Sequence, residues 1–262
     1  MSETPDTGNE ERWRNYFNGT DPAARAGRAL WGKLPSPPRC DLCAAPFKGP
    51  FAPLLRLIGK RPFVKNPRYC DFCISRLMKA QGGAEIEMSA LFADVRGSTP
   101  LAEQLGPTRT REIIDRFYTA GVEVLCQGGA MVDRFMGDQI VGYFVPLYTP
   151  AHPRSAIETG LALLRATGNL AGKESWIPIG VGVHTGRAFI GTVGRASGLL
   201  ELTAIGESIN LAARLASVAG AGELVCSEAA YVAAGVTVEA ERREMVLKGV
   251  SAPVVVRVLR TD

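Results

Sequence analysis

From residue 84 onward the chain alternates short apolar segments with amphipathic ones, and this alternation restricts the possible folds more than any other feature of the sequence. Apolar, β-branched segments predict strands at 86–95, on both sides of a tight turn at 136–139, at 176–194 and near the C-terminus. Helical periodicity separates them, at 99–126, 152–168 and 205–218. The order β-α-β-β-α-β predicts an α+β, ferredoxin-like fold with helices on one face of a mostly antiparallel sheet.

Three domains are expected along the chain: a tail with two short helices at 1–39, a Cys-rich module at 40–80, and the α+β domain at 85–262. In the tail, Asp21 followed by Pro22 is typical of a helix start, because the first caps the helix and the second has its φ angle already set. Within the α+β domain, we expect 176–194 to form two strands joined by a turn near Thr185 and Gly186.

The composition indicates a folded protein of the cell interior. Of 262 residues, 46% are hydrophobic and 21% charged, which excludes a disordered or fibrous chain. No apolar run approaches the ~18 residues that cross a bilayer, and the first residues are too acidic for a secretory signal. We therefore expect a cytoplasmic location, where six cysteines indicate metal ligands or free thiols rather than disulfides.

Positive charge is concentrated in one part of the chain. Residues 25–79 contain twelve Lys or Arg and two Asp, a net charge of +10, so the rest carries −6 of the total of +4. Basic segments bind nucleic acid or anionic lipid, but metal-bound thiolates and a solvated face also account for this charge. Interleaved aromatic residues on strands, typical of a nucleic-acid surface, are lacking. The sequence therefore offers no firm indication of a nucleic-acid or membrane partner.

Four cysteines of the 40–80 module are arranged as two Cys-x2-Cys pairs, Cys40 with Cys43 and Cys70 with Cys73. Each pair lets two sulfurs reach one ion, and two pairs complete a tetrahedral thiolate site. The 26 residues between the pairs exceed the usual spacing, which a loop accommodates. We predict one structural Zn²⁺ per chain, with an iron–sulfur cluster, which takes the same four ligands, as the alternative.

Two aspartates, Asp94 and Asp138, are candidates for a catalytic metal site. Asp94 ends an apolar strand and precedes a helix, while Asp138 lies at the turn of a hairpin. In a ferredoxin-like sheet that strand and that hairpin are neighbours, so the two carboxylates can converge. Paired carboxylates bind hard divalent cations, and two such ions stabilise the attacking and leaving oxygens of a phosphoryl transfer.

Other polar groups suit a nucleotide. The amides of Gly97, Ser98 and Thr99 lie at the start of a helix, where backbone N–H groups can meet a polyphosphate. Asn210 and Arg214 are four residues apart and share one face of a predicted helix. An amide beside a guanidinium suits a ribose oxygen and a phosphate.

Five segments, in this order, resemble the class III nucleotidyl cyclase family, the adenylyl and guanylyl cyclases. They are LFADVRGSTPLAE, VDRFMGDQIVGYF, IGVGVHTGRAFIGTVG, LTAIGESINLAARL and LKG. The resemblance extends from about Ile86 to Leu259. The segment with four cysteines also resembles the cysteine-rich extension that precedes some bacterial cyclase domains. The resemblance implies the cyclase fold and synthesis of a cyclic nucleotide.

It also implies a role for each residue of the catalytic segments. Asp94 and Asp138, assisted by the Val95 carbonyl, would bind two Mg²⁺ or Mn²⁺ ions. Asn210 would orient the ribose, and Arg214 would stabilise negative charge on the α-phosphate. The ribose 3′-OH would attack the α-phosphorus and pyrophosphate would leave, without a protein nucleophile.

Four further positions match nucleotide contacts of the family. Arg187 and Lys248 match residues that contact phosphates, and Thr203 and Arg134 match the two that select the base. The usual residue at position 134 is Lys. Thr203 can accept and Arg134 can donate a hydrogen bond, as adenine requires, although the arginine fork suits guanine better. We predict ATP as substrate, with GTP, or a catalytically weak regulator that binds a nucleotide or partner, as alternatives.

The resemblance further implies a homodimer. In this family the metal carboxylates come from one subunit, and the base-selecting residues, the Asn and the Arg come from the other. This chain carries both sets in a single cyclase domain. A head-to-tail homodimer would therefore form two equivalent sites at its interface.

Overall fold

The computed structural model contains two compact units, each formed by several parts of the chain. Unit 1 comprises Met1–Ile86, Pro146–Tyr148 and Phe189–Ala204, and unit 2 comprises Glu87–Val145, Thr149–Ala188 and Ile205–Asp262. The structure describes residues 7–34, 38–40, 42–64, 66–170, 172–194, 201–237, 239–249 and 252–261. Among these residues, no helix is both long enough and apolar enough to cross a membrane.

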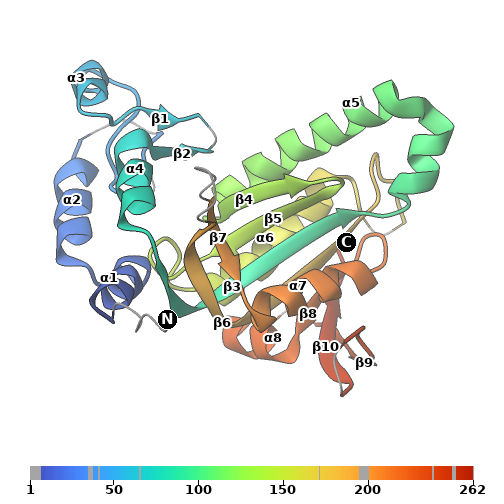
Figure 1. Cartoon of the computed structure of the whole chain (residues 1–262). Helices are drawn as coiled ribbons and strands as arrows, with labels where there is room; N and C mark the ends of the chain where they lie inside the picture. Colours follow the sequence, from blue (N-terminus) through green and yellow to red (C-terminus); the bar gives the residue numbers. More distant parts are fainter. Residues whose placement is uncertain are drawn as a thin grey trace. The chain divides into compact units, whose positions relative to one another are not determined.

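A mixed sheet, most of which belongs to unit 2, has the strand order β4-β5-β3-β6-β8-β10-β9 (Figure 1). Its strands are β3 (Gly83–Val95), β4 (Met131–Met136), β5 (Gln139–Phe144), β6 (Ile179–Val193), β8 (Leu224–Ser227), β9 (Glu241–Met245) and β10 (Val254–Leu259). Helix α5 (Ser98–Gln127) connects β3 to β4, and α6 (His152–Ala166) connects β5 to β6. This connectivity is ferredoxin-like, and the predicted α+β fold class is confirmed.

The segment that we expected to form two strands is one continuous strand. β6 extends over 15 residues and passes through Thr185 and Gly186 without a turn. Gly186 is instead required by close packing, because a Cβ at this position would lie 2.6 Å from Ser208 Oγ. The prediction of a turn was wrong because a glycine that permits close approach cannot be distinguished in a sequence from one that permits a turn.

Helices cover both faces of the sheet in unit 2. On one face α6 packs so closely that a Cβ at Gly160 would lie 3.1 Å from Val181 Cγ1. On the other face lies α7 (Glu207–Val218), and a Cβ at Gly182 would come within 2.1 Å of the Ala216 amide nitrogen. Successive strand residues point to opposite faces. The expectation of helices on one face was therefore wrong, because α7 lies outside the β-α-β-β-α-β pattern from which it was drawn.

The helix predicted from residue 205 begins later, after a short strand. This strand, β7 (Glu201–Ile205), pairs with β6, and α8 (Glu228–Ala234) follows β8 further along the chain. Gly206, at φ 138°, separates β7 from α7 in a conformation that favours glycine. Strand β7 was not predicted, because periodicity does not distinguish a short apolar strand from the first turn of a helix.

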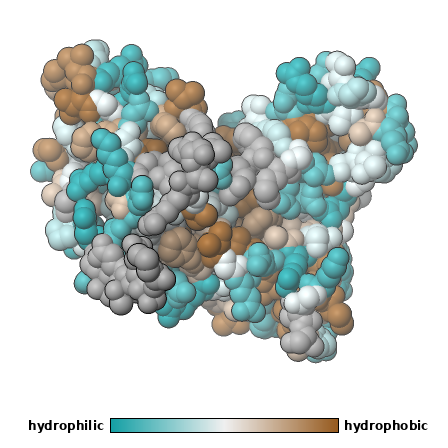
Figure 2. Space-filling model, viewed as in Figure 1, coloured by the Kyte–Doolittle hydropathy of each residue, from teal (hydrophilic) through white to brown (hydrophobic). Residues whose placement is uncertain are grey.

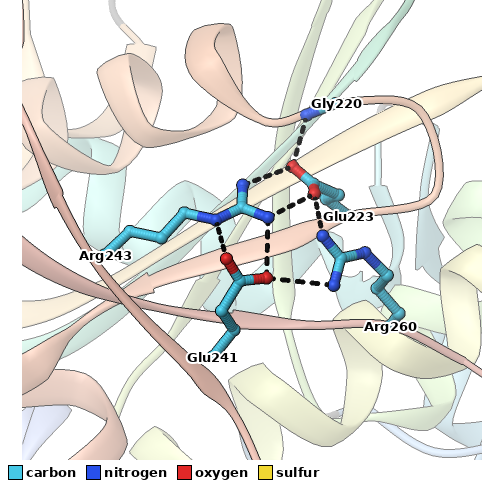
Figure 3. Close-up of polar contacts among 5 residues, drawn as sticks. All are labelled: Gly220, Glu223, Glu241, Arg243 and Arg260. Atoms are coloured by element: carbon cyan, nitrogen blue, oxygen red, sulfur yellow. Dashed lines mark hydrogen bonds and ion pairs between the residues drawn. The ribbon is translucent and has the colours of Figure 1, made fainter.

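An ion-pair cluster connects the loop after α7 to the edge of the sheet (Figure 3). Glu223 accepts hydrogen bonds from the Gly220 amide at 3.0 Å, from Arg243 at 3.2 Å and from Arg260 at 2.5 Å. Glu241 contacts the same two arginines, at 2.6 and 3.2 Å. Burial acts to raise the pKa of Glu223, but the Gly220 amide and the arginines lower it below its ordinary value. The cluster therefore holds the end of α7 against β9 and the residues after β10.

Unit 1 contains the two tail helices expected from the sequence, α1 (Thr7–Phe17) and α2 (Pro22–Gly32). The Asp21 side chain caps α2 by accepting a first-turn amide at 2.6 Å. Trp13 and Phe17 of α1 are buried, and their ring centroids lie 5.7 Å apart. The later elements are α3 (Ala52–Leu57), β1 (Pro62–Phe63), β2 (Asn66–Cys70) and α4 (Asp71–Ala80).

Two histidines of unit 2 are hydrogen-bonded to serines inside the fold. His152 Nδ1 lies 2.8 Å from Ser89 Oγ, and His184 Nδ1 lies 2.7 Å from Ser227 Oγ. Burial lowers the pKa of both histidines below the ordinary value, although a glutamate near each acts in the opposite direction. Both imidazoles are therefore held in the neutral form.

We expect the protein to lose stability as the pH falls below ~6.5, the ordinary histidine pKa. A histidine whose pKa is lower in the folded chain than in the unfolded chain favours unfolding once it is protonated. Its contribution is therefore complete above that pH and is lost as the pH falls toward the folded-state pKa, with a slope of at most ~1.4 kcal/mol per pH unit. Thermal melts from about pH 7.5 to about pH 5 should show this decline, and His152→Asn should make it shallower. Equal slopes in the two proteins would exclude His152 as a source.

Candidate functional site: a carboxylate pair and a cysteine cluster

Strand pairing brings the two predicted metal aspartates to the same end of β3 and β5. Asp94 is the penultimate residue of β3, and Asp138 lies in the turn between β4 and β5. Asp94 pairs with Gln139 across the two strands, and the Val95 amide donates to the Asp138 carbonyl at 3.2 Å. The hairpin register therefore places the two aspartates beside each other.

The electrostatics of Asp94 suit a cation. Burial raises the pKa of Asp94, the Arg96 guanidinium opposes this rise, and the Asp138 carboxylate adds to it. Arg96 forms an ion pair with Asp94, and its Nη1 donates to the Ser217 carbonyl at 3.1 Å. Two neighbouring carboxylates repel each other, and a divalent cation relieves that repulsion. The donor set therefore fits hard divalent ions. Arg96 was not among the site residues predicted from the sequence, although its place two residues after Asp94 was a signal.

Helix α5 begins directly after this strand end. Gly97 is its N-cap and has a left-handed backbone conformation, at φ 67°. The Leu101 amide donates to the Gly97 carbonyl at 3.0 Å, which is the first bond of the helical pattern. The amides of Ser98 and Thr99 precede that bond and have no partner within the helix. They form the kind of helix N-terminus that binds phosphate.

Asn210 and Arg214 lie one turn apart on α7, where Asn210 is exposed and Arg214 is half-buried. Arg214 Nη1 lies 3.4 Å from the carbonyl of Gly249, next to the exposed Lys248. A Cβ at Gly249 would lie 3.2 Å from the Arg214 guanidinium, and the residue has φ 74°, so both space and backbone favour glycine there. The structure thus places Arg214 beside the loop that carries Lys248.

The other predicted nucleotide-contact residues lie on three different strands. Arg187 is exposed on β6, and its carbonyl accepts a hydrogen bond from Ser208 Oγ at 2.7 Å, near the start of α7. Thr203 is buried on β7 and belongs to unit 1, whereas α7 belongs to unit 2. Arg134 lies on β4, but its side chain is outside the described residues. The predicted base-selecting pair is therefore not seen together in the described part of the chain.

Tyr118 is a site residue that the sequence did not indicate. Its hydroxyl, on α5, donates to the Gly137 carbonyl in the turn that carries Asp138. Burial raises the pKa of Tyr118, and the Asp138 carboxylate adds to this effect. A neutral phenol therefore holds the turn in place. No local pattern could reveal this contact, because it joins a helix to a hairpin that follows it in the chain.

The four paired cysteines of unit 1 form one compact cluster. The sulfurs of Cys40, Cys43, Cys70 and Cys73 all lie within 4.8 Å of one another, and those of Cys43 and Cys70 are 3.9 Å apart. A tetrahedral zinc site with bonds of about 2.3 Å separates its sulfurs by roughly 3.8 Å. The donor set and its size therefore fit a thiolate-bound metal ion.

Local backbone structure presents these sulfurs. The Cys40 amide donates to the Ala45 carbonyl at 2.9 Å and closes the first pair into a turn. Cys70 ends β2, and Cys73 lies in the first turn of α4. The Cys70 amide also donates to Cys40 Sγ at 3.2 Å. A hydrogen bond from Cys40 is the main cause that lowers the pKa of Cys43 well below its ordinary value.

Lys60 was not among the residues predicted from the sequence for this cluster. It is buried, and its Nζ donates to Cys43 Sγ at 3.4 Å while lying 4.1 Å from the Phe72 ring centroid. A cation at this distance offsets part of the negative charge that four thiolates carry on a divalent ion. Lys60 therefore belongs to the surroundings of the cysteine cluster.

Residues 82–257 match the profile of the adenylate and guanylate cyclase catalytic domain. An uncharacterized protein of Mycobacterium tuberculosis is 33% identical over 139 residues, which are 53% of this chain and 24% of that protein. An adenylate cyclase of Anabaena cylindrica is 29% identical over 133 residues, which are 49% of this chain and 26% of that protein. The chain thus spans about a quarter of the length of these relatives.

Solved cyclase structures have the same fold. The adenylyl cyclase CyaB from P. aeruginosa is 26% identical with a TM-score of 0.61, and the match covers 69% of this chain and 97% of that one. The guanylyl cyclase Cya2 is 26% identical with a TM-score of 0.60, and covers 68% of this chain and 93% of that one. Similar proteins thus include both kinds of cyclase. Because the matched profile covers well over half of its residues, this chain belongs to the adenylate and guanylate cyclase catalytic domain family.

Proposed function

We propose that this protein is a class III adenylate cyclase that converts ATP to 3′,5′-cyclic AMP and pyrophosphate. The observation that carries the proposal is the carboxylate pair, Asp94 and Asp138, at the start of α5. In the reaction the ribose 3′-oxygen bonds to the α-phosphorus, the bond to the β-phosphate oxygen breaks, and the hydroxyl proton is released. Two Mg²⁺ or Mn²⁺ ions would supply Lewis-acid stabilisation of the attacking and leaving oxygens.

The roles of the chain's own residues are binding and orientation. Asp94, Asp138 and the Val95 carbonyl would hold the ions at the strand end. The amides of 97–99 would donate to phosphate oxygens at the helix N-terminus. Tyr118 would keep the Asp138 turn in one position.

The α7 residues and their neighbours would bind the rest of the substrate. Asn210 would orient the ribose, and the Arg214 guanidinium would stabilise charge that develops on the α-phosphate. Arg187 and Lys248, both exposed cations, would contact the phosphates. Thr203 and Arg134 would read the adenine edge, which presents a donor and an acceptor.

We also propose that the cyclase domain occupies residues 85–262 and that residues 40–80 form a module folded around one structural zinc ion, after a tail at 1–39. The cysteine cluster supports the zinc assignment, because four thiolates leave no open position for catalysis.

The function is tested with purified protein, Mn²⁺, and either ATP or GTP, with mass spectrometry of the products. We expect cyclic AMP from ATP and a smaller yield of cyclic GMP. Arg134→Lys should increase the preference for ATP by about tenfold, because it removes the fork that pairs with guanine. A preference for GTP would make the protein a guanylate cyclase. Nucleotide binding without any cyclic product would indicate a regulator that binds nucleotides.

The homodimer is tested by complementation. In the single chain Asp94 pairs with Arg96 while Arg214 contacts Gly249, so the two halves of the proposed site have different partners. Asp94→Ala and Arg214→Ala should each be inactive alone. A mixture should regain activity, approaching about a quarter of the wild-type level, because a mixed dimer contains one intact site of two. A mixture that stays inactive although its subunits exchange would refute the shared site.

A further inference from the structure

One segment of unit 1 combines strong positive charge with exposed apolar side chains. Residues 42–70 contain six Lys or Arg and no Asp or Glu. Five large apolar side chains within 51–64 are exposed, and we name this set the apolar tip: Phe51, Leu54, Leu57, Ile58 and Val64. Leu57 and Val64 have 82% and 95% of their surface exposed, the two largest values among the large apolar side chains that the structure describes.

Helix α3 explains why two residues of the apolar tip, Leu54 and Leu57, point outward. Ala52 and Leu55 are buried and fix the inner side of this short helix, so Leu54 and Leu57 lie on its outer side. Figure 2 shows brown, hydrophobic atoms gathered over α3. Contiguous exposed apolar surface on a folded protein usually marks an interaction site, because its exposure to water is unfavourable.

A basic hollow of about 710 Å³ lies next to the apolar tip and shares Leu57 with it. Its lining includes two apolar side chains, four cations and one acid: Leu57, Phe72, Arg56, Arg61, Arg76, Lys79 and Asp71. The acid, Asp71, pairs with Arg61 at 2.5 Å, so three further cations determine the charge of the hollow. The apolar tip thus lies beside a basic hollow suited to a phosphate group.

We propose that this surface binds an anionic phospholipid bilayer. The apolar tip inserts at the boundary between headgroups and acyl chains, while Arg56, Arg76 and Lys79 contact lipid phosphates. This combination of exposed aliphatic residues and clustered cations is what an interfacial membrane site requires, since neither contribution alone gives stable binding. The proposal concerns unit 1 and does not depend on the proposed cyclase activity.

Two other partners fit this surface less well. A nucleic acid would satisfy the cations and its bases could stack on Phe51 or Phe72. It would still leave the more exposed aliphatic side chains of Leu54, Leu57 and Val64 in water. A second copy of the chain would cover the apolar tip, but it would bring the exposed Arg56 and Arg61 beside the tip against the same two arginines of the other copy. An anionic bilayer satisfies both the charge and the apolar surface.

The proposal is tested by cosedimentation of the full, metal-loaded chain with vesicles. We expect binding to vesicles of phosphatidylcholine with phosphatidylglycerol that exceeds binding to pure phosphatidylcholine by at least about tenfold and weakens with salt. The pair of substitutions Leu57→Ser and Ile58→Ser should lower the affinity by about tenfold or more. Arg56→Gln and Arg76→Gln should each lower it by about fivefold.

Matched controls distinguish vesicle binding through this surface from nonspecific binding. Val232→Ser on α8 removes an aliphatic side chain that is 67% exposed, and Arg111→Gln removes an exposed cation of α5. Neither should change vesicle binding, and all variants should keep their metal content and circular dichroism spectrum. Equal binding to neutral and anionic vesicles, or binding insensitive to the Leu57 and Ile58 substitutions, would overturn the proposal. Binding of a DNA or RNA oligonucleotide through Arg56 and Arg76, with no vesicle binding, would replace it by a nucleic-acid surface.

Discussion

Asp94→Asn and Asp138→Asn are each expected to reduce cyclic nucleotide formation by at least ~1,000-fold, with the protein still folded. Each substitution keeps the size of the side chain and removes one negative charge from the site at the end of β3 and β5. A neutral amide holds a divalent cation less strongly than a carboxylate does, so the charge stabilisation that the ions would supply is lost. The measurement is product formation at saturating Mn²⁺, together with a thermal melt.

The melt distinguishes a metal site from a structural role. Because the Asp138 carboxylate raises the pKa of Asp94, removing that charge should leave stability unchanged or slightly higher in the absence of metal. The matched control is Asp115→Asn on α5, an exposed carboxylate that pairs with Arg111 at 3.2 Å, and its activity should stay within about twofold of wild type. Substantial activity in a folded Asp94 or Asp138 variant would show that the two aspartates do not bind the catalytic ions.

Loss of the proposed zinc ion from the cysteine cluster is expected to unfold the region around it. Structural zinc contributes ~10–16 kcal/mol of apparent binding free energy in small sites, and that energy stabilises the fold. Elemental analysis should find one zinc per chain. Chelation, or Cys73→Ser, should increase hydrogen exchange in residues 40–80 before it does so in the sheet of unit 2. Cys126→Ser is the matched control, since Cys126 lies on α5 outside the cluster and should keep the full zinc content.

Two other results of the elemental analysis would contradict the zinc assignment. Iron with a visible charge-transfer absorbance would identify an iron–sulfur cluster and make the module a redox or oxygen sensor. Absence of metal, with all four thiols alkylated in the native protein, would contradict both assignments. The Lys60 contact offers a further check, because Lys60→Met should weaken metal retention without removing a ligand.

Features that depend on neighbouring residues were predictable from the sequence. The hairpin turn at 136–139 separates β4 from β5 as expected, because glycine and polar residues between two apolar runs leave few alternatives. Asp21 caps α2 as expected, because a carboxylate directly before Pro22 can accept a hydrogen bond from a backbone amide of the first helical turn. The cysteine pairs could likewise be read from their spacing, because each pair needs only one local turn.

Features that depend on packing were not predictable. Gly186 looked like a turn residue but lies in the middle of β6, because the reason for glycine there is Ser208 on α7. Similarly, the position of α7 on the second face of the sheet follows from its approach to Gly182, a contact between residues distant in sequence. Periodicity reports which side of an element is apolar and does not report which partner covers it.

The sequence by itself determined which reactive groups this protein carries. The carboxylates, the polar pair on a helix, the four thiols and the excess of cations are all residue types at fixed spacings. Only the tertiary structure decided which groups surround them. Arg96 beside Asp94 and Lys60 beside Cys43 are contacts made after the chain has folded. The exposure of Leu57 also depends on which side of α3 faces the core. Propensity and spacing act over a few residues, whereas contact and burial depend on the path of the whole chain.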